Sequence, residues 1–257
     1  MPAVIEERID GVLRLQLNEP ETLNALSPRL TAELSRHVAA ATEDSRVRCV
    51  LLTATGRAFC SGGDIRTMDD RRPNAVRALL QAHHGWIRRL LEGGKPVVTA
   101  VNGPAAGAGF AIALLGDVVI ASDAAVFRSA FLGIGAIPDL GLAHTLSRAV
   151  GFQRASDIIL TNRPVRVDEA ERMGLVARVV PAEKLQSEAL AVAQALAMGP
   201  TTAIGLARAL LRRAQDTPFE KHLEAEALAQ AVAFGTHDFA EGVVAFREKR
   251  PPRFNGR

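Results

Sequence analysis

The sequence predicts an α/β protein whose C-terminal part is helical. Short apolar runs of the kind that form buried strands alternate with amphipathic helical stretches up to about residue 142. Glycine-rich turns separate these runs, and after residue 142 the pattern becomes almost wholly helical. Strand, loop and helix units followed by helices are typical of a sheet covered by helices. The 257 residues, 48% of them hydrophobic, are enough to bury a large core as one large domain or two unequal ones.

Composition disfavours several classes of protein. The two cysteines, Cys49 and Cys60, form no C-x-x-C pair, so we expect neither a disulfide framework nor a zinc site, and a reducing cytoplasm fits best. The N-terminus shows no signal-peptide pattern, and the longest apolar stretches, 97–101 and 105–120, are broken well short of a membrane span. Net charge is +3 with basic and acidic residues interleaved. We therefore expect a cytoplasmic protein without a nucleic-acid or membrane partner.

The chain begins with a predicted hairpin. The runs 4–9 and 12–17 are of β type and flank Asp10-Gly11, a dipeptide that favours a tight turn. Ser27 before Pro28 is typical of a helix N-cap, and apolar residues at helical spacing extend this helix to about residue 42.

Three buried strands are predicted next. Their apolar runs end in turn residues, as a buried strand does before a loop. The runs are 47–54, which leads into the glycine-rich loop 56–64; 96–101, which leads into Asn102-Gly103-Pro104; and the shorter 118–121. A helix over 74–91, stopped by Gly93-Gly94, separates the first two. Residues 127–141 show no clean period, and we expect this segment to line a site.

The remainder is predicted to be helical with one strand. Helical runs follow Pro181, Pro200 and Pro218, and the stretch 175–180 is strand-like. Asp168 with Glu171 forms a D-x-x-E pattern that predicts a helix N-cap at Asp168. No sequence repeat of fixed period is found.

Two segments, 50–64 and 97–112, combine a buried strand, a glycine-bearing loop and the start of a helix. The first N–H groups of a helix lack partners and lie at its positive end, so each junction can donate hydrogen bonds to an anion or a polarised oxygen. Two such donors that converge on one oxygen would form an oxyanion hole. On spacing alone, a purely structural role of each glycine-rich turn is the favoured interpretation.

The second junction also matches part of a dinucleotide-binding fingerprint, because Gly107-Ala108-Gly109 follows a strand and opens a helix. The third glycine of that fingerprint is replaced by Ile112, and Asp123 comes early for a ribose-binding acid. A nicotinamide cofactor is therefore the weaker hypothesis.

The residues at these two junctions resemble a known family. Arg57-Ala58-Phe59-Cys60-Ser61-Gly62-Gly63-Asp64-Ile65 and Val101-Asn102-Gly103-Pro104-Ala105-Ala106-Gly107-Ala108-Gly109 are similar to the two oxyanion-loop motifs of the crotonase (enoyl-CoA hydratase/isomerase) family. They occur in the family's order and at a family-like separation. Leu23-Asn24-Ala25-Leu26, Leu160-Thr161-Asn162-Arg163 and the stretch from Glu241 to Phe254 extend the resemblance over nearly the whole chain.

The resemblance implies a fold, a substrate and an assembly. It implies a crotonase-like spiral of ββα units over residues 1–200 and a helical C-terminal region, 201–257, that serves oligomerisation and covers the active site. The implied assembly is a homotrimer or a homohexamer of two trimers. The implied substrate is an acyl-CoA thioester, with no separate cofactor and no metal, because CoA is part of the substrate.

The resemblance also assigns roles to individual residues. The backbone N–H groups of Gly63 and Ala108 are expected to bind the thioester oxygen and stabilise the enolate that forms when the neighbouring carbon loses a proton. The positions expected to contact the substrate are Ala25, Ser61, Asp64, Ile65, Phe131 and His84. Asp64 can alternatively act as a helix N-cap.

Two positions argue against hydration. Family members that hydrate enoyl-CoA use one glutamate just after the second oxyanion loop and another about twenty residues later. Here these positions are Ala111 and Phe131. Hydration needs two carboxylates to hold and deliver water, and this chain has neither of them at those positions.

Asp139 is the remaining carboxylate candidate. The stretch from Phe127 to Asp139 resembles that of enoyl-CoA isomerases, epoxyphenylacetyl-CoA isomerases of the phenylacetate pathway among them, in which an aspartate at this place shuttles a proton. An apolar wall of Phe131, Ile134 and Ile137 would raise the pKa of Asp139 and suit it to that role. The structural alternative is that Asp139 caps the helix that follows it.

Other hypotheses remain beside an isomerase. One is an enoyl-CoA hydratase, and another is a hydrolytic aroyl-CoA dehalogenase that uses Asp139 as nucleophile with His83 or His84, although the tryptophan of those enzymes is Phe131 here. The third is a non-catalytic acyl-CoA-binding paralogue, motivated by the two missing glutamates. The chain has no tyrosine, no G-x-S-x-G elbow and no Walker loop, which disfavours tyrosyl-acid, covalent-serine and P-loop mechanisms.

Overall fold

The main sheet has six strands in the order β1-β2-β3-β4-β6-β9. A computed structural model describes residues 1–257. The strands are β1 (Val4–Ile9), β2 (Val12–Leu17), β3 (Cys49–Ala54), β4 (Val97–Val101), β6 (Val118–Ser122) and β9 (Arg178–Val180). β1 pairs antiparallel with β2, and all other neighbours are parallel. The predicted hairpin and the three buried strands are confirmed, β3 beginning two residues later than predicted.

A second sheet of three short strands was not predicted. It consists of β5 (Ala105–Ala106), β7 (Val126–Arg128) and β8 (Pro164–Arg166), in the order β5-β7-β8. Strands of two or three residues carry no measurable alternation of apolar and polar side chains, so a sequence pattern cannot reveal them. β7 lies at the start of the stretch that shows no clean period.

Each of four strands of the main sheet is followed first by a short β-bridge or strand that pairs outside the main sheet, and then by a helix. β2 is followed by a bridge from Leu26 to Gly63, and β3 by a bridge from Cys60 to Ala105. β4 and β6 are followed by β5 and β7, which pair with each other. The helices that close the four turns are α1 (Pro28–Glu43), α2 (Pro73–Glu92), α3 (Ala108–Ala113) and α4 (Leu142–Val150). The predicted spiral of ββα units is confirmed.

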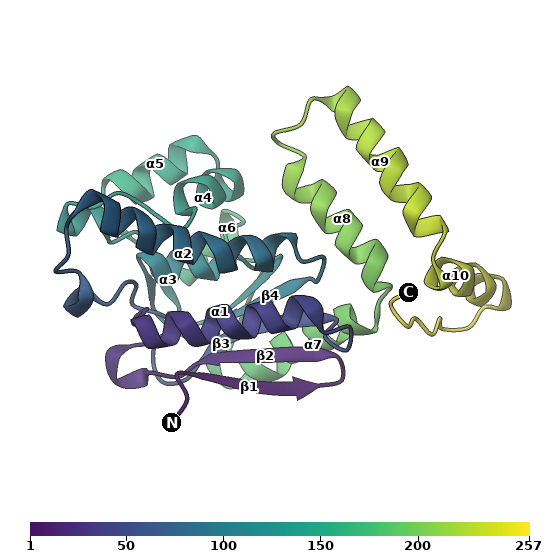
Figure 1. Ribbon diagram of the computed structural model, residues 1–257, viewed down its shortest axis with the longest axis horizontal. Helices are drawn as coiled ribbons and strands as arrows, with labels where there is room; N and C mark the ends of the chain where they lie inside the picture. Colours follow the sequence, from purple (N-terminus) through teal and green to yellow (C-terminus); the bar gives the residue numbers. More distant parts are fainter.

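Helices cover both faces of the main sheet (Figure 1). α1 and α2 run side by side, α1 over β1 and β2, and α7 (Leu185–Met198) packs on the sheet from the other side. Ser27 caps α1 as predicted, because its Oγ accepts a hydrogen bond from the N–H of Leu30 at 3.1 Å. The buried Leu30, Leu34 and Val38 recur every four residues, so one stripe of α1 faces the sheet.

The second half is helical as predicted, with differences at boundaries. Its remaining helices are α5 (Phe152–Leu160), α6 (Val167–Arg172), α8 (Thr201–Arg213), α9 (Phe219–Phe234) and α10 (His237–Glu248). Along the whole chain there are four 3-10 turns, η1 (Pro20–Thr22), η2 (Ile65–Thr67), η3 (Phe131–Ile134) and η4 (Ala182–Lys184). The predicted N-cap at Asp168 is wrong. α6 begins at Val167, so Asp168 lies in its first turn, where a negative charge is favourable without any capping bond.

Helices α8, α9 and α10 stand apart from the sheet at one side of the molecule (Figure 1). α9 has no buried residue, although it is rich in apolar side chains. Phe219, Leu228 and, on α10, Phe246 are 71%, 67% and 85% exposed. No single helix is long and apolar enough to cross a membrane, and only a bent pair, residues 182–198 with 201–213, meets that criterion when its parts are combined.

A buried arginine attaches α8 to the core. Arg208 is 5% exposed, and its Nε donates to Asp117 Oδ2 at 2.5 Å. Its other nitrogens donate to the carbonyls of Leu90 and Leu91 at the end of α2. Arg212 also pairs with Asp117. Polar contacts of this kind, rather than apolar burial, fix the position of α8, whose only buried residue is Arg208.

Candidate active site

Hydrogen bonds join the two glycine-rich loops. The N–H groups of Phe59 and Cys60 both donate to the carbonyl of Pro104, at 3.0 and 3.3 Å. The N–H of Ala106 donates in return to the carbonyl of Cys60 at 2.9 Å. The loops leave the carboxyl ends of the neighbouring parallel strands β3 and β4 and therefore converge, which spacing alone could not establish.

Gly63 and Ala108 each present a backbone N–H that donates to no protein atom. Ala108 is the first residue of α3, and helical bonding begins only with the N–H of Ala111, which donates to Gly107. The two loops touch here, because a β-carbon on Gly62 would stand 3.5 Å from the nitrogen of Ala108. Two free donors on adjoining loops can bind an oxygen that carries negative charge.

Two glycines make this approach possible. Gly107 has φ 53° and ψ −126°, the dihedrals of the first central position of a type II′ turn, which glycine favours. Gly109 lies directly against the first loop, and a β-carbon there would overlap the carbonyl oxygen of Cys60. The motif glycines therefore allow the backbone of α3 to contact the first loop.

Asn24 ties the first loop to the N-terminal segment. Its side chain is fully buried, and Nδ2 donates to the carbonyls of Thr55 and Ala58, both at 2.9 Å. Its Oδ1 accepts a hydrogen bond from the N–H of Glu19 at 2.8 Å. Sequence reasoning quoted Asn24 within a motif but missed this role. Only the residue type pointed to it, because asparagine is enriched in left-handed turns and Asn24 has φ 55°.

Ala25 and Ser61 lie on either side of this junction. The N–H of Ser61 donates to the carbonyl of Leu23 at 3.0 Å, and that of Leu26 to the carbonyl of Gly62 at 2.8 Å. Ala25 is buried and Ser61 is exposed. Ser61 belongs to the first loop and Ala25 lies beside it, and the contact of either residue with a substrate stays a prediction.

Asp64 acts as an N-cap in this structure. Its carboxylate accepts hydrogen bonds from the N–H and Nε of Arg66, at 3.1 and 2.8 Å, at the start of η2. The Arg66 guanidinium lowers the pKa of Asp64, which keeps the carboxyl ionised. Ile65 is 70% exposed and free to contact a ligand.

Asp139 is a half-buried carboxyl without a compensating partner. Its Oδ1 is inaccessible to solvent and accepts no hydrogen bond. Burial raises the pKa of Asp139 to about 6, and only its own backbone N–H acts in the opposite direction. The helix-cap alternative is wrong, because the N-cap of α4 is Gly141 and only the backbone carbonyl of Asp139 bonds the helix, from the N–H of Leu142.

The apolar wall predicted around Asp139 is wrong in part. Ile134 and Ile137 are 66% and 78% exposed, so they do not form part of a buried wall. Phe131 is buried, and its Cζ lies 3.9 Å from the position that a β-carbon on Gly107 would take. Phe131 therefore adjoins the second glycine-rich loop. Ala111, the other position where hydratases carry glutamate, is buried within α3.

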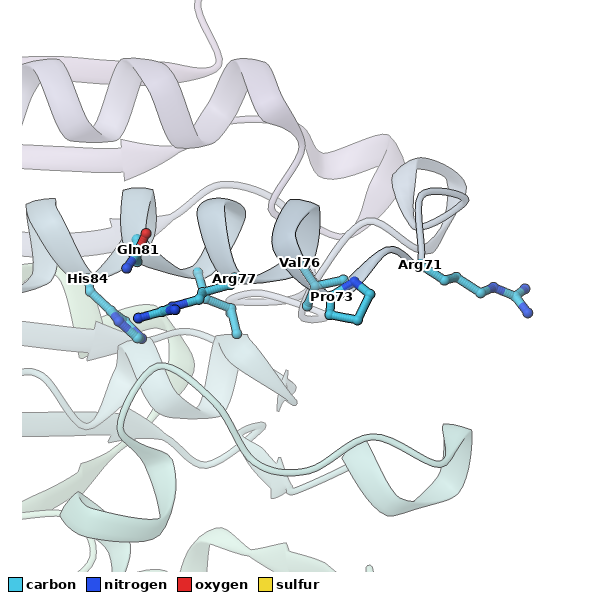
Figure 2. Close-up of a pocket in the computed structure, with 7 residues that line it drawn as sticks. Arg71, Pro73, Val76, Arg77, Gln81 and His84 are labelled. Carbon is cyan, nitrogen blue, oxygen red and sulfur yellow. The ribbon is translucent and has the colours of Figure 1, made fainter.

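The two histidines of α2 differ in their surroundings. His83 is buried, its Nδ1 accepts a hydrogen bond from Trp86 Nε1 at 3.4 Å, and burial lowers its pKa. His84 lines a pocket of about 590 Å³ together with Arg71, Pro73, Val76, Arg77, Leu80 and Gln81. Figure 2 shows His84 and Arg77 pointing to the same side of α2. The lining includes neither Asp139 nor a residue of the two glycine-rich loops, so substrate binding by His84 stays a prediction.

No group of three or more histidine, cysteine, aspartate or glutamate side chains is placed to hold a metal ion. The titratable groups of the two loops are also few. Asp64 is engaged by Arg66, and Cys60 is buried with its pKa raised to about 12. Asp139, which lies outside both loops, is the carboxyl whose pKa is raised to about 6.

The site therefore combines two hydrogen-bonded glycine loops with two backbone N–H groups that no protein atom accepts, an arrangement able to bind a negatively charged oxygen. The sequence profile of the enoyl-CoA hydratase/isomerase family matches residues 7–257. The chain belongs to this family, whose members act on CoA thioesters.

Among individual relatives, some are named isomerases and others hydratases. The 1,2-epoxyphenylacetyl-CoA isomerase of Escherichia coli is 37% identical over 251 residues, 96% of each chain. A Rhodobacter capsulatus protein named "Probable enoyl-CoA hydratase" is also 37% identical, over 96% of each chain. The crystal structure of an enoyl-CoA hydratase/isomerase from Cupriavidus metallidurans superposes with a TM-score of 0.93 at 33% identity, covering 100% of this chain and 97% of that one. The family and fold predictions are confirmed, whereas isomerase and hydratase activities are not separated by these relatives.

Proposed function

We propose that the protein is an acyl-CoA isomerase that moves a double bond, or rearranges a ring, next to a CoA thioester. The observation that carries this proposal is Asp139, a half-buried carboxyl whose Oδ1 has no partner and whose pKa is raised to about 6. A general base works best when its pKa lies near the operating pH. The 37% identity to an epoxyphenylacetyl-CoA isomerase supports the same choice.

The proposed reaction has two proton transfers. The Asp139 carboxylate takes a proton from the carbon next to the thioester carbonyl, and the electron pair of the broken C–H bond forms a C=C bond as the carbonyl oxygen becomes negative. The N–H groups of Gly63 and Ala108 bind that oxygen. The protonated Asp139 then returns its proton to the carbon two bonds further along, and a β,γ-enoyl thioester becomes the conjugated α,β isomer.

The two donors supply the main stabilisation in this scheme. Neither N–H is bonded to protein, so no internal hydrogen bond has to break when the enolate forms. A single donor of this kind typically contributes about 3 kcal/mol to the transition state. Because the loops that carry Gly63 and Ala108 are bonded to each other, the donors are held in place before substrate binds.

Hydration is the weaker function for this site. Water has to be deprotonated and a proton delivered to the substrate, which two carboxylates share in the hydratases of the family. The two positions are Ala111 and Phe131, and both are buried here. Neither side chain can accept a proton from water.

The test compares 3-enoyl-CoA and 2-enoyl-CoA of matched chain length with wild type and Asp139→Asn. We expect the absorbance of the conjugated thioester to appear from the 3-enoyl substrate, without a gain in mass. The variant is expected to lose about 100-fold or more in kcat, the usual scale for a general base. Asp168→Asn is the matched control, because it makes the same change on an exposed carboxylate of α6.

The outcomes separate the alternatives. Addition of water would indicate a hydratase with an unforeseen acid. Hydrolysis of a halogenated aroyl-CoA, lost in Asp139→Asn and in His84→Ala, would indicate a dehalogenase. Binding of CoA thioesters without any product would indicate a non-catalytic paralogue. An Asp139→Asn variant that isomerises at the wild-type rate would refute the role assigned to Asp139.

We also propose that α8, α9 and α10 form the interface of a homotrimer or of a homohexamer. The support is the large apolar area that these helices leave uncovered, Phe219, Leu228 and Phe246 among it. Sedimentation analysis of the purified chain should give a trimer or a hexamer. A monomer at micromolar concentration would refute this assembly.

A further inference from the structure

Asn162, which follows α5, contacts three points of the turn that joins β7 to η3. Its Oδ1 accepts a hydrogen bond from the N–H of Ala130 at 2.8 Å. Its backbone carbonyl accepts a hydrogen bond from Arg128 Nε at 3.0 Å. Its Nδ2 lies against Gly133, 3.0 Å from the position of a β-carbon there. The side chain and the backbone carbonyl of Asn162 together therefore contact residues 128, 130 and 133.

The turn needs such a partner because its backbone is unusual. Ala130 has φ 63°, a left-handed conformation that residues with a β-carbon rarely adopt. Its N–H donates only to Asn162. Asn162 itself has φ 52°, which asparagine tolerates better than most residues. Loss of the Asn162 side chain would leave this N–H without an acceptor, and the turn would lose the hydrogen bond that joins it to residue 162.

The same turn supports the second oxyanion loop. The N–H of Gly107 donates to the carbonyl of Arg128 at 3.0 Å, and Ala108, with its free N–H, is the next residue. Phe131 follows the turn directly and packs against Gly107. The turn therefore determines where the backbone of Gly107 lies, and with it the direction of the Ala108 donor.

The turn also leads to the proposed base. The carbonyl of Phe131 accepts a hydrogen bond from the N–H of Ala136 at 3.0 Å, which closes η3 and the segment that ends at Asp139. A displacement of residues 128–131 would thus move both groups that have to meet one substrate. No other side chain bonds the N–H of Ala130.

We propose that Asn162 is a positioning residue for the isomerase reaction. It acts through the turn of residues 128–131 and keeps the Ala108 N–H and the Asp139 carboxylate at their places relative to the substrate. This inference rests on the proposed function and adds a residue that has no catalytic contact of its own.

Three variants test the role. Asn162→Gly removes the side chain and keeps the left-handed backbone, whereas Asn162→Asp keeps an oxygen that can accept from Ala130. Thr161→Ala is the matched neighbour, because its hydroxyl bonds only the carbonyl of Asp157 in α5. Should Asn162→Gly fail to fold, Asn162→Ser replaces it, with a hydroxyl too short to span the same distance.

The expected result is a split between kcat and KM. Misplacement of a donor by a fraction of an ångström to an ångström costs roughly 10- to 100-fold in rate, so Asn162→Gly should lose about that factor in kcat with little change in KM. Asn162→Asp should restore most of the rate, and Thr161→Ala should match wild type. Equal rates for Asn162→Gly and wild type would overturn the proposal. Asn162→Asp as slow as Asn162→Gly would overturn it as well.

A second readout does not need isomerisation. Acetoacetyl-CoA ionises to an enolate whose charge is shared between the ketone and thioester oxygens, and two donors at the thioester oxygen should favour that form when the ligand is bound. The ultraviolet band of the enolate at saturating ligand should weaken in Asn162→Gly and persist in Asn162→Asp. A wild type that neither isomerises nor forms the enolate would overturn the proposed function. A wild type that does both, with an equally competent Asn162→Gly, would overturn the positioning role alone.

Discussion

Replacement of Asp139 by asparagine is expected to stabilise the protein at neutral pH while it lowers kcat for isomerisation by about 100-fold or more. Burial raises the pKa of the Asp139 carboxyl from 3.8 to about 6 in the folded chain. Between these two values the folded state binds more protons than the unfolded state, so stability falls as pH rises through that window. Above pH 6 the native protein carries a half-buried carboxylate that asparagine does not.

The shift sets the size of the effect. A difference of about 2 pKa units corresponds to about 3 kcal/mol of unfolding free energy at full effect. Asp139 is only partly buried, and screening by water should reduce this to about 1–2 kcal/mol. For a chain of this length that is about 3–6 °C in melting temperature.

The assay is thermal unfolding of wild type and Asp139→Asn from pH 4 to 8 at one protein concentration, since assembly also affects stability. The advantage of the variant should be absent near pH 4 and should grow to its full size above pH 6. This pH dependence separates the charge from any fixed effect of the amide. Asp168→Asn, on an exposed carboxylate, should show no such trend. A stability difference that does not change with pH would refute the assignment of a strained carboxylate at Asp139.

Three further results are expected. The kcat/KM for isomerisation should fall as pH drops through about 6, because a protonated Asp139 cannot take a proton, and a flat pH profile would contradict the raised pKa. Gly109→Ala should abolish activity and destabilise the fold, because its β-carbon would meet a carbonyl of the first loop. Its control is Gly85→Ala, which has open space around it and should stabilise α2 by about 0.5–1 kcal/mol in chemical denaturation. Arg208→Met should lower the free energy of unfolding by about 2–3 kcal/mol in the same measurement, because Asp117 loses a buried partner. A loss as small as that of the surface variant Arg213→Met would contradict this prediction.

The elements that could be predicted are those whose signal is local. Asp10-Gly11 between two β-type runs specified the hairpin, and Ser27 before Pro28 specified the start of α1. The parallel strands β3 and β4 were visible because both are buried on two faces and therefore apolar throughout. The strands of the small sheet escaped prediction because two or three residues are too few to show a period.

The candidate site was predictable only through its motifs. Gly63 and Ala108 could be named because the glycine loops resemble those of a family, and the structure then joined the loops through Cys60, Pro104 and Ala106. Contacts between residues more than forty positions apart leave no local pattern. Asn162 shows the same limit, since nothing in its neighbourhood in the chain indicates that it bonds a turn thirty residues earlier.

The sequence by itself determined the fold class, the family and the identity of the loops, because strand and helix periods and glycine motifs are properties of neighbouring residues. The tertiary structure alone decided what surrounds each titratable group. Asp64 became an ion-paired N-cap, Ile134 and Ile137 turned to solvent, and Asp139 was left with an oxygen that has no partner. The pKa of a carboxyl depends on the water it loses and the donors it gains, and both are set by residues that only folding brings near.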